Sequence, residues 1–139
     1  MIKTILIDAN IVIRFLLNDH STLSPVAKAI FLKAQKGETR IYFDEVILAE
    51  VIWTLSSFYK IKKNMIIDQL EKLLSQNWII NPKKNSLIKA LTLYRSSNLD
   101  YIDCWLFTVS QIQKTALVTF DSDLKKMINK RKSLDPKSN

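Results

Sequence analysis

A carboxylate and an amide stand where the first apolar run of the chain ends. Residues 5–7 are aliphatic and predict a strand buried on both faces, and Asp8 and Asn10 follow it. In open α/β sheets, ligands bind in the crevice at the carboxyl ends of the strands, so Asp8 is predicted to lie at a site. The ordinary alternative is that Asp8 or Asn10 caps the next helix.

A second apolar run near the end of the chain repeats this arrangement. Residues 116–120 predict another core strand, and Asp121 and Asp123 come at its end. The alternative here is that Asp121 caps the terminal helix while Asp123 interacts with the positive end of the helix dipole.

Three further acids belong to predicted helices. Glu50 interrupts a nearly unbroken apolar stretch, where a buried carboxylate would be costly unless it were paired or bound to a cation. A solvated outer face of the helix is the alternative.

Asp100 and Asp103 are three residues apart at a helix start and therefore share one face. Asp100 by itself is typical of a helix N-cap. Asp103 belongs to the first turn and precedes a run of large apolar side chains, so capping does not explain it.

Acids that converge on one pocket have a specific chemistry. Their mutual repulsion raises their pKa values unless a cation compensates. Oxygen-rich sites suit Mg²⁺ or Mn²⁺, which keep several waters and bind a few carboxylates together with substrate phosphate. Such a metal can activate water and polarise a phosphoryl oxygen, so a phosphodiester is hydrolysed without a protein nucleophile.

Other chemistries are restricted by what the chain lacks. Its single glycine excludes a phosphate-cradling glycine loop. His20 is the only histidine, so a catalytic triad or a histidine-rich zinc site would depend on one loop residue, which we expect to be ordinary surface. Cys104 is expected to be a small buried hydrophobe.

Composition predicts a basic, cytoplasmic protein. The 139 residues fit one domain, 1–139, with a basic, frayed tail from about residue 130. A net charge of +8 and a pI near 9.6 favour an anionic partner, of which nucleic acid is the commonest. One cysteine favours a reducing compartment, and neither a signal-peptide pattern nor a membrane-spanning apolar run is expected.

Strands and helices are expected to alternate along the chain. The predicted strands are 5–7, 40–43, 77–81 and 116–120. The predicted helices are 11–17, one that Ser24 caps and Gly37 ends, 45–59 with Asp44 as its cap, 64–74, 86–96, one from about 100, and a terminal helix. This alternation predicts an α/β fold with a mainly parallel sheet between helices.

Taken together, four segments resemble the motifs of PIN-domain ribonucleases, and most closely those of the VapC-type toxins of bacterial and archaeal toxin–antitoxin pairs. The resemblance covers residues 1 to about 129, and it lies in the order and spacing of the whole set. The segments are Asp8-Ala9-Asn10, Leu48-Ala49-Glu50-Val51-Ile52-Trp53-Thr54-Leu55, Asp100-Tyr101-Ile102-Asp103 and Thr119-Phe120-Asp121-Ser122-Asp123.

The resemblance implies a three-layer α/β/α PIN-like domain and a set of functional residues. Those implied to bind Mg²⁺ or Mn²⁺ and to activate water are Asp8, Glu50, Asp103 and Asp121. Auxiliary roles fall to Asn10, which would orient Asp8 by a hydrogen bond, and to Asp100 and Asp123. Arg14, the only charge in the first helix, is a candidate for substrate binding. The implied partners are an RNA substrate, a cognate VapB-type antitoxin and a second copy in a homodimer, with no membrane.

Two other functions stay open at this point. A catalytically inactive PIN-like domain would bind RNA or a protein, although an abandoned metal pocket would gain nothing from keeping mutually repelling acids. An aspartate-based phosphatase or phosphotransfer domain would also place aspartate at a strand end. Its usual second aspartate, two residues after the first, is here Asn10.

Overall fold

The computed structural model describes residues 2–134 and divides the chain into two compact units, which we describe separately. Unit 1 is Met1–Lys84 and unit 2 is Asn85–Asn139.

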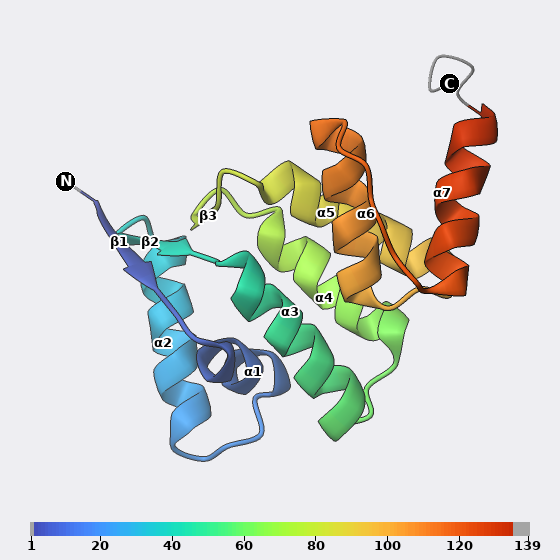
Figure 1. The fold of residues 1–139 in the computed structure, drawn as a ribbon. Coiled ribbons are helices and arrows are strands. Elements are labelled where there is room, and N and C mark those ends of the chain that lie inside the picture. Colours follow the sequence, from blue (N-terminus) through green and yellow to red (C-terminus); the bar gives the residue numbers. More distant parts are fainter. Residues whose placement is uncertain (1, 135–139) are drawn as a thin grey trace. The chain divides into compact units, whose positions relative to one another are not determined.

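A parallel sheet forms the centre of unit 1 (Figure 1). Its three strands lie in the order β1-β2-β3 and are Lys3–Leu6, Thr39–Tyr42 and Ile79–Ile80. Ile41 pairs with Ile5 on one side and with Ile79 on the other, and both Ile41 and Ile79 are fully buried. Parallel strands need helical crossovers, so the predicted α/β fold class is confirmed.

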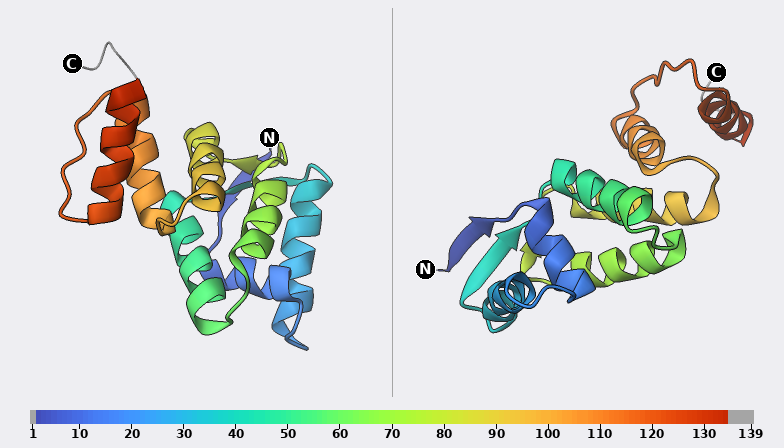
Figure 2. Two further views of the ribbon diagram at one scale, coloured as in Figure 1. Left: turned by 90° about the vertical axis from the view of Figure 1, so that its right-hand side faces the viewer. Right: turned by 90° about the horizontal axis from the view of Figure 1, so that it is seen from below.

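Helices connect these strands and cover the sheet. In chain order they are α1 (Ala9–Leu17), α2 (Leu23–Gln35), α3 (Glu45–Trp53), the π-helix η1 (Thr54–Phe58) and α4 (Lys63–Leu74). Helix α1 packs against α2 and α3, while α2 contacts β2 and α4 contacts β3 (Figures 1 and 2). The apolar positions of each helix recur at helical spacing, and the buried ones build the core of this unit.

Helix α2 begins differently from its prediction. It starts at Leu23 rather than at Pro25, and the Ser24 hydroxyl donates to the carbonyl of Arg14 over 2.8 Å. The first amides of the helix donate to Nδ1 of His20, with 2.9 Å from the nitrogen of Leu23. The prediction of a Ser24 cap is therefore wrong, because α1 uses that hydroxyl and the His20 ring caps the helix in its place.

The other end of α2 is as predicted. Gly37 adopts φ +84°, and its nitrogen donates to the carbonyl of Ala34 over 2.9 Å. Only glycine takes this left-handed backbone without strain, which explains why the helix stops here.

The predicted helix 45–59 is two elements. Its second part, η1, is a π-helix in which the nitrogen of Tyr59 donates to the carbonyl of Thr54 over 3.2 Å. Asp44 caps the first part by accepting a 2.8 Å hydrogen bond from the nitrogen of Val46, as predicted.

Unit 2 is helical. Its helices are α5 (Lys84–Ser96), α6 (Tyr101–Gln113) and α7 (Ser122–Leu134). Helices α6 and α7 contact each other and run in the same direction, joined by an extended connection that returns beside them (Figures 1 and 2). No helix in the described part of the chain is long and apolar enough to cross a membrane.

Two strand predictions need correction. Residues 116–120 are extended but pair with no strand of the described chain, and Val118 and Phe120 are almost completely exposed. An apolar run forms a core strand only where a neighbouring strand completes its hydrogen bonds. The first strand does form, but it is an edge strand beside β2 alone, and Leu6 is 73% exposed rather than buried on both faces.

The C-terminal tail was predicted to be frayed from about residue 130. Helix α7 continues to Leu134, so this part of the tail is helical, and residues 135–139 lie outside the described part of the chain.

Candidate functional site

Asp100 and Asp103 form a carboxyl pair at the start of α6. Asp100 occupies the N-cap position with extended backbone angles, φ −76° and ψ 169°, but its side chain makes no capping hydrogen bond. It hydrogen-bonds the Asp103 side chain instead.

The Asp103 carboxyl holds its proton unusually strongly. Burial of the side chain is the largest cause, followed by the hydrogen bond to Asp100 and then by the negative charges of Asp100 and Asp121. Together these effects raise the pKa of Asp103 to about 6. A carboxyl in this position is what a nearby cation would stabilise in its charged form.

The parallel course of α6 and α7 explains how Asp121 comes to influence Asp103. Because the extended connection runs back along α6, both helices begin at the same end of unit 2 (Figure 1). Asp121 lies at the start of α7, where its Oδ2 accepts a 2.8 Å hydrogen bond from the nitrogen of Leu124. The capping alternative for Asp121 is therefore correct, and the same residue also adds negative charge near Asp103. Asp123 is exposed in the first turn of α7.

Asp8 caps α1 in unit 1. Its Oδ1 accepts a 3.1 Å hydrogen bond from the nitrogen of Ile11, and its side chain is exposed. The capping alternative is correct here as well. A carboxylate accepts more than one bond per oxygen, so the cap leaves Asp8 with lone pairs for a cation.

Arg14 ties the start of α1 to the end of η1. Its guanidinium donates to the side chains of Asn10 over 3.3 Å, Asp19 over 3.0 Å and Tyr59 over 2.9 Å. These bonds fix the Asn10 amide on Arg14. They also give Arg14 a structural role, so its contact with substrate stays a prediction, as does the orientation of Asp8 by Asn10.

Glu50 lies on the exposed side of α3. Leu48, Val51 and Ile52 form the buried side of that helix. The apolar residues of α3 surround it, and Trp53 is 66% exposed. The apolar stretch around Glu50 therefore does not bury the carboxylate, and the solvated-face alternative is correct.

The structure thus brings some predicted residues together. Asp100, Asp103 and Asp121 share one end of unit 2, while Asp8 and Glu50 lie on α1 and α3, which pack together in unit 1. Within residues 2–134 no three acidic, histidine or cysteine side chains are arranged to hold a metal ion. The donors fit Mg²⁺ or Mn²⁺ by chemistry, since all are oxygen atoms and one has a raised pKa.

A polar network at the carboxyl ends of β2 and β3 was not predicted. The buried Asn81 amide donates to the carbonyl of Phe43 over 2.8 Å and to Glu45 over 2.9 Å. Lys83 adds an ion pair of 3.1 Å to Glu45. The hydrogen bond from Asn81 is the largest cause that lowers the pKa of Glu45. The available signal was an asparagine directly after an apolar strand, the same pattern as Asp8.

Comparison with protein-family models gives one match, and it spans both units. The model of the PIN domain matches residues 5–130. Comparisons with curated proteins and with solved structures found no match. The match and the parallel sheet agree with the three-layer α/β/α fold that the sequence predicts. The chain therefore belongs to the PIN domain family, whose members are generally metal-dependent nucleases.

Proposed function

We propose that this PIN domain is a metal-dependent endoribonuclease of the VapC type, the toxin of a toxin–antitoxin pair. The observation that carries the proposal is the PIN-domain match over residues 5–130, and the acids beside Asp103, which raise its pKa, support it. Acids that lie close together repel one another, and a hard divalent ion offsets that repulsion.

The proposed metal ligands are Asp8, Glu50, Asp103 and Asp121, which would hold Mg²⁺ or Mn²⁺. When bound, the ion supplies an activated water and polarises the scissile phosphate. Because the pKa of Asp103 is about 6, its protonation would compete with cation binding below that pH. Asp100, Asp123 and Asn10 are proposed as auxiliary residues, and Arg14 as a substrate contact.

Charge supports RNA as the substrate. The chain has 21 lysine and arginine residues against 13 acids, and several of the cations lie exposed on α7. Lysine and arginine side chains release counterions when they bind a phosphate backbone, so affinity falls steeply with salt. Affinity for RNA that did not change with ionic strength would refute this part of the proposal.

The proposed assembly and location follow from the resemblance to VapC-type toxins. We expect a homodimer in the cytoplasm, silenced by a cognate VapB-type antitoxin. Co-expression with the protein encoded beside this gene, followed by size-exclusion chromatography with light scattering, tests both partners. A monomer that forms no complex with that protein would contradict the toxin assignment.

The test of activity uses purified protein and total cellular RNA with Mg²⁺ or Mn²⁺, beside EDTA. Asp8→Asn removes one proposed ligand charge and keeps a side chain that caps helices well. Its matched control is Asp44→Asn, which makes the same change at the start of α3, outside the proposed site. We expect discrete fragments from the unmodified protein and from Asp44→Asn, and none with Asp8→Asn or EDTA.

Other results would point elsewhere. Cleavage that persists in Asp8→Asn at the original rate would remove Asp8 from the site. RNA binding without cleavage, in protein freed of any antitoxin, would favour a domain that only binds RNA.

A further inference from the structure

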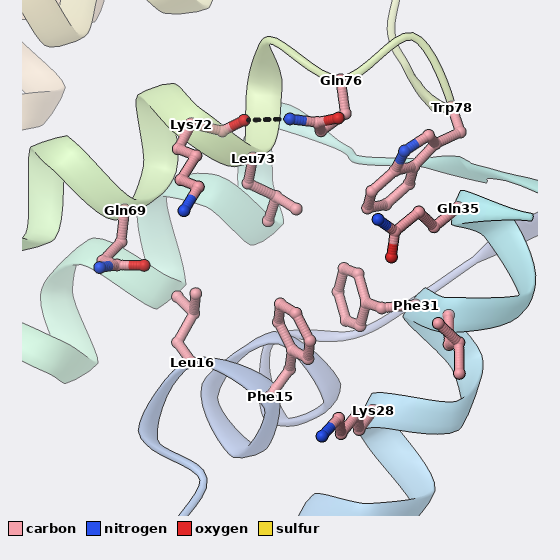
Figure 3. Close-up of a pocket in the computed structure, with 11 residues that line it drawn as sticks. Phe15, Leu16, Lys28, Phe31, Gln35, Gln69, Lys72, Leu73, Gln76 and Trp78 are labelled. Carbon is pink, nitrogen blue, oxygen red and sulfur yellow. Dashed lines mark hydrogen bonds between the residues drawn. The ribbon is translucent and has the colours of Figure 1, made fainter.

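A pocket in unit 1 lies apart from all the proposed metal ligands. It has a volume of about 350 Å³ and is bounded by α1, α2, α4 and the residues just before β3 (Figure 3). This volume is within the range of small-molecule sites, about 300–1,000 Å³, and near its lower end. None of the acids of the proposed metal site lines it.

Aromatic rings form one wall of this pocket. Phe15 and Phe31 stack with ring centroids 4.1 Å apart, and Trp78 meets Phe31 edge-on at 6.1 Å. Phe31 is 2% exposed, so the core holds its ring in place, whereas Phe15 and Trp78 are partly exposed and present surface to the pocket. Rings arranged in this way favour a flat aromatic guest, which can stack on one ring and meet the edge of another.

Two helices supply the polar rim with the same spacing. Helix α2 contributes Lys28, Phe31, Leu32 and Gln35, at positions i, i+3, i+4 and i+7. Helix α4 contributes Gln69, Lys72 and Leu73 at positions i, i+3 and i+4, and Gln76 follows two residues after the helix ends. Each helix therefore presents an apolar centre with a lysine and amides around it, and Figure 3 shows the Lys72 ammonium on the pocket side of α4.

Both charged residues in the lining of this pocket are lysines. Lys28 and Lys72 are exposed, and they are the only charged residues that the described chain places in the lining. The amides of Gln35 and Gln69 can each donate two hydrogen bonds and accept others. The two lysines lie on opposite sides of the pocket (Figure 3), so an acidic group on a guest would meet one of them directly, without a competing carboxylate in the lining. A charge-assisted hydrogen bond is about twice as strong as a neutral one.

We propose that this pocket binds a small aromatic carboxylate, with its ring against the aromatic wall of Phe15, Phe31 and Trp78 and its acid group at Lys72, whose ammonium is on the pocket side of α4. The site is separate from the proposed nuclease activity and does not depend on it. The apolar wall supplies the burial and the lysines select the charge, so a neutral or cationic molecule with the same ring binds more weakly.

The test uses 2-naphthoate as the probe, with its neutral analogue 2-naphthamide and its cationic analogue 2-naphthylmethylamine. Each is titrated into the ¹⁵N-labelled full chain and followed by amide chemical shifts. Lys72→Ala is expected to weaken 2-naphthoate binding by about fivefold, Lys28→Ala by less, and the double variant by more than Lys72→Ala alone. Lys33→Ala is the matched control, because it removes an exposed lysine of α2 that does not line the pocket.

The expected result is a set of saturable shifts in α1, α2 and α4 for 2-naphthoate, with binding that weakens as salt is added. Equal affinity for the amide and the carboxylate would overturn the proposal. So would shifts outside these helices, no shift at millimolar probe, or equal loss of affinity in Lys33→Ala and Lys72→Ala.

Discussion

Replacing Asp103 by asparagine should stabilise the protein and abolish its proposed activity. In the folded chain, burial and the neighbouring acids raise the pKa of Asp103 from 3.8 to about 6. Above pH 6 the Asp103 side chain is ionised in the folded state, although its burial and the neighbouring acids disfavour that charge. Asparagine has almost the same shape, can hydrogen-bond to Asp100 and never ionises.

The size of this effect follows from linkage. A pKa difference of one between the folded and unfolded states changes the free energy of unfolding by about 1.4 kcal/mol, so the full difference would change it by about 3 kcal/mol. Asp103 is partly exposed, and water screens its interactions, which reduces the expected gain to on the order of 1 kcal/mol. For a chain of this length, that corresponds to a rise in Tm of roughly 3–5 °C.

The effect has a defined pH dependence. Between pH 3.8 and about 6 the folded state binds more protons at Asp103 than the unfolded state, so the stability that its proton confers is lost as pH rises. The gain from Asp103→Asn should therefore be largest above pH 6 and should shrink as pH falls towards 3.8. Thermal melts by circular dichroism in EDTA, at intervals from pH 4 to 8, measure it. A lower Tm for Asp103→Asn at pH 7.5, or a gain that does not change with pH, would refute the reasoning.

Three further substitutions test the account of the fold. Asn81→Ala should lower the free energy of unfolding by about 1–3 kcal/mol in urea denaturation, because the buried amide makes two hydrogen bonds; an unchanged midpoint would contradict this. Gly37→Ala should cost about 1 kcal/mol from backbone strain alone, since an added Cβ meets nothing within 4 Å, and Gly37→Asn should cost less. Phe31→Ala should cost about 3–5 kcal/mol, and a loss below 1 kcal/mol would show that the Phe15–Phe31 stack is not part of the core.

Patterns of local origin were predictable from the sequence. The helical spacing of apolar residues located α4 and α5 within two residues of their observed starts, and Gly37 marked the end of α2. Aspartate before a helix indicated capping at Asp8 and Asp44, and both residues cap helices. These features depend on residues close together in the chain, which is why composition and spacing are sufficient to predict them.

Features that depend on distant partners were not predictable. Residues 116–120 have the composition of a core strand, yet they pair with no described strand and expose Phe120. Ser24 is a residue type that commonly caps helices, but its hydroxyl donates a hydrogen bond to the carbonyl of Arg14 instead. The sequence did not decide between a buried and a solvated Glu50, because α3 is apolar on its exposed side too, so that periodicity did not identify the outer face.

The candidate site was predictable in part. The sequence identified Asp100 and Asp103 as sharing a helix face, and the structure joins them by a hydrogen bond. The influence of Asp121 depends on α6 and α7 running in the same direction, which no local pattern specifies. The Asn81 network was missed because its acceptors, Phe43 and Glu45, are more than thirty residues away in the chain.

The central claim is that the acids of all four motifs bind one metal centre, and paramagnetic broadening by Mn²⁺ tests it most directly. Mn²⁺ is added at substoichiometric amounts to the ¹⁵N-labelled chain, with Mg²⁺ as the diamagnetic control and Asp44→Asn as the control variant. The account predicts that amide signals next to Asp8, Glu50, Asp103 and Asp121 broaden together, and that Asp103→Asn prevents it. Broadening confined to the neighbourhood of Asp100 and Asp103, or spread evenly over the surface acids, would contradict the claim.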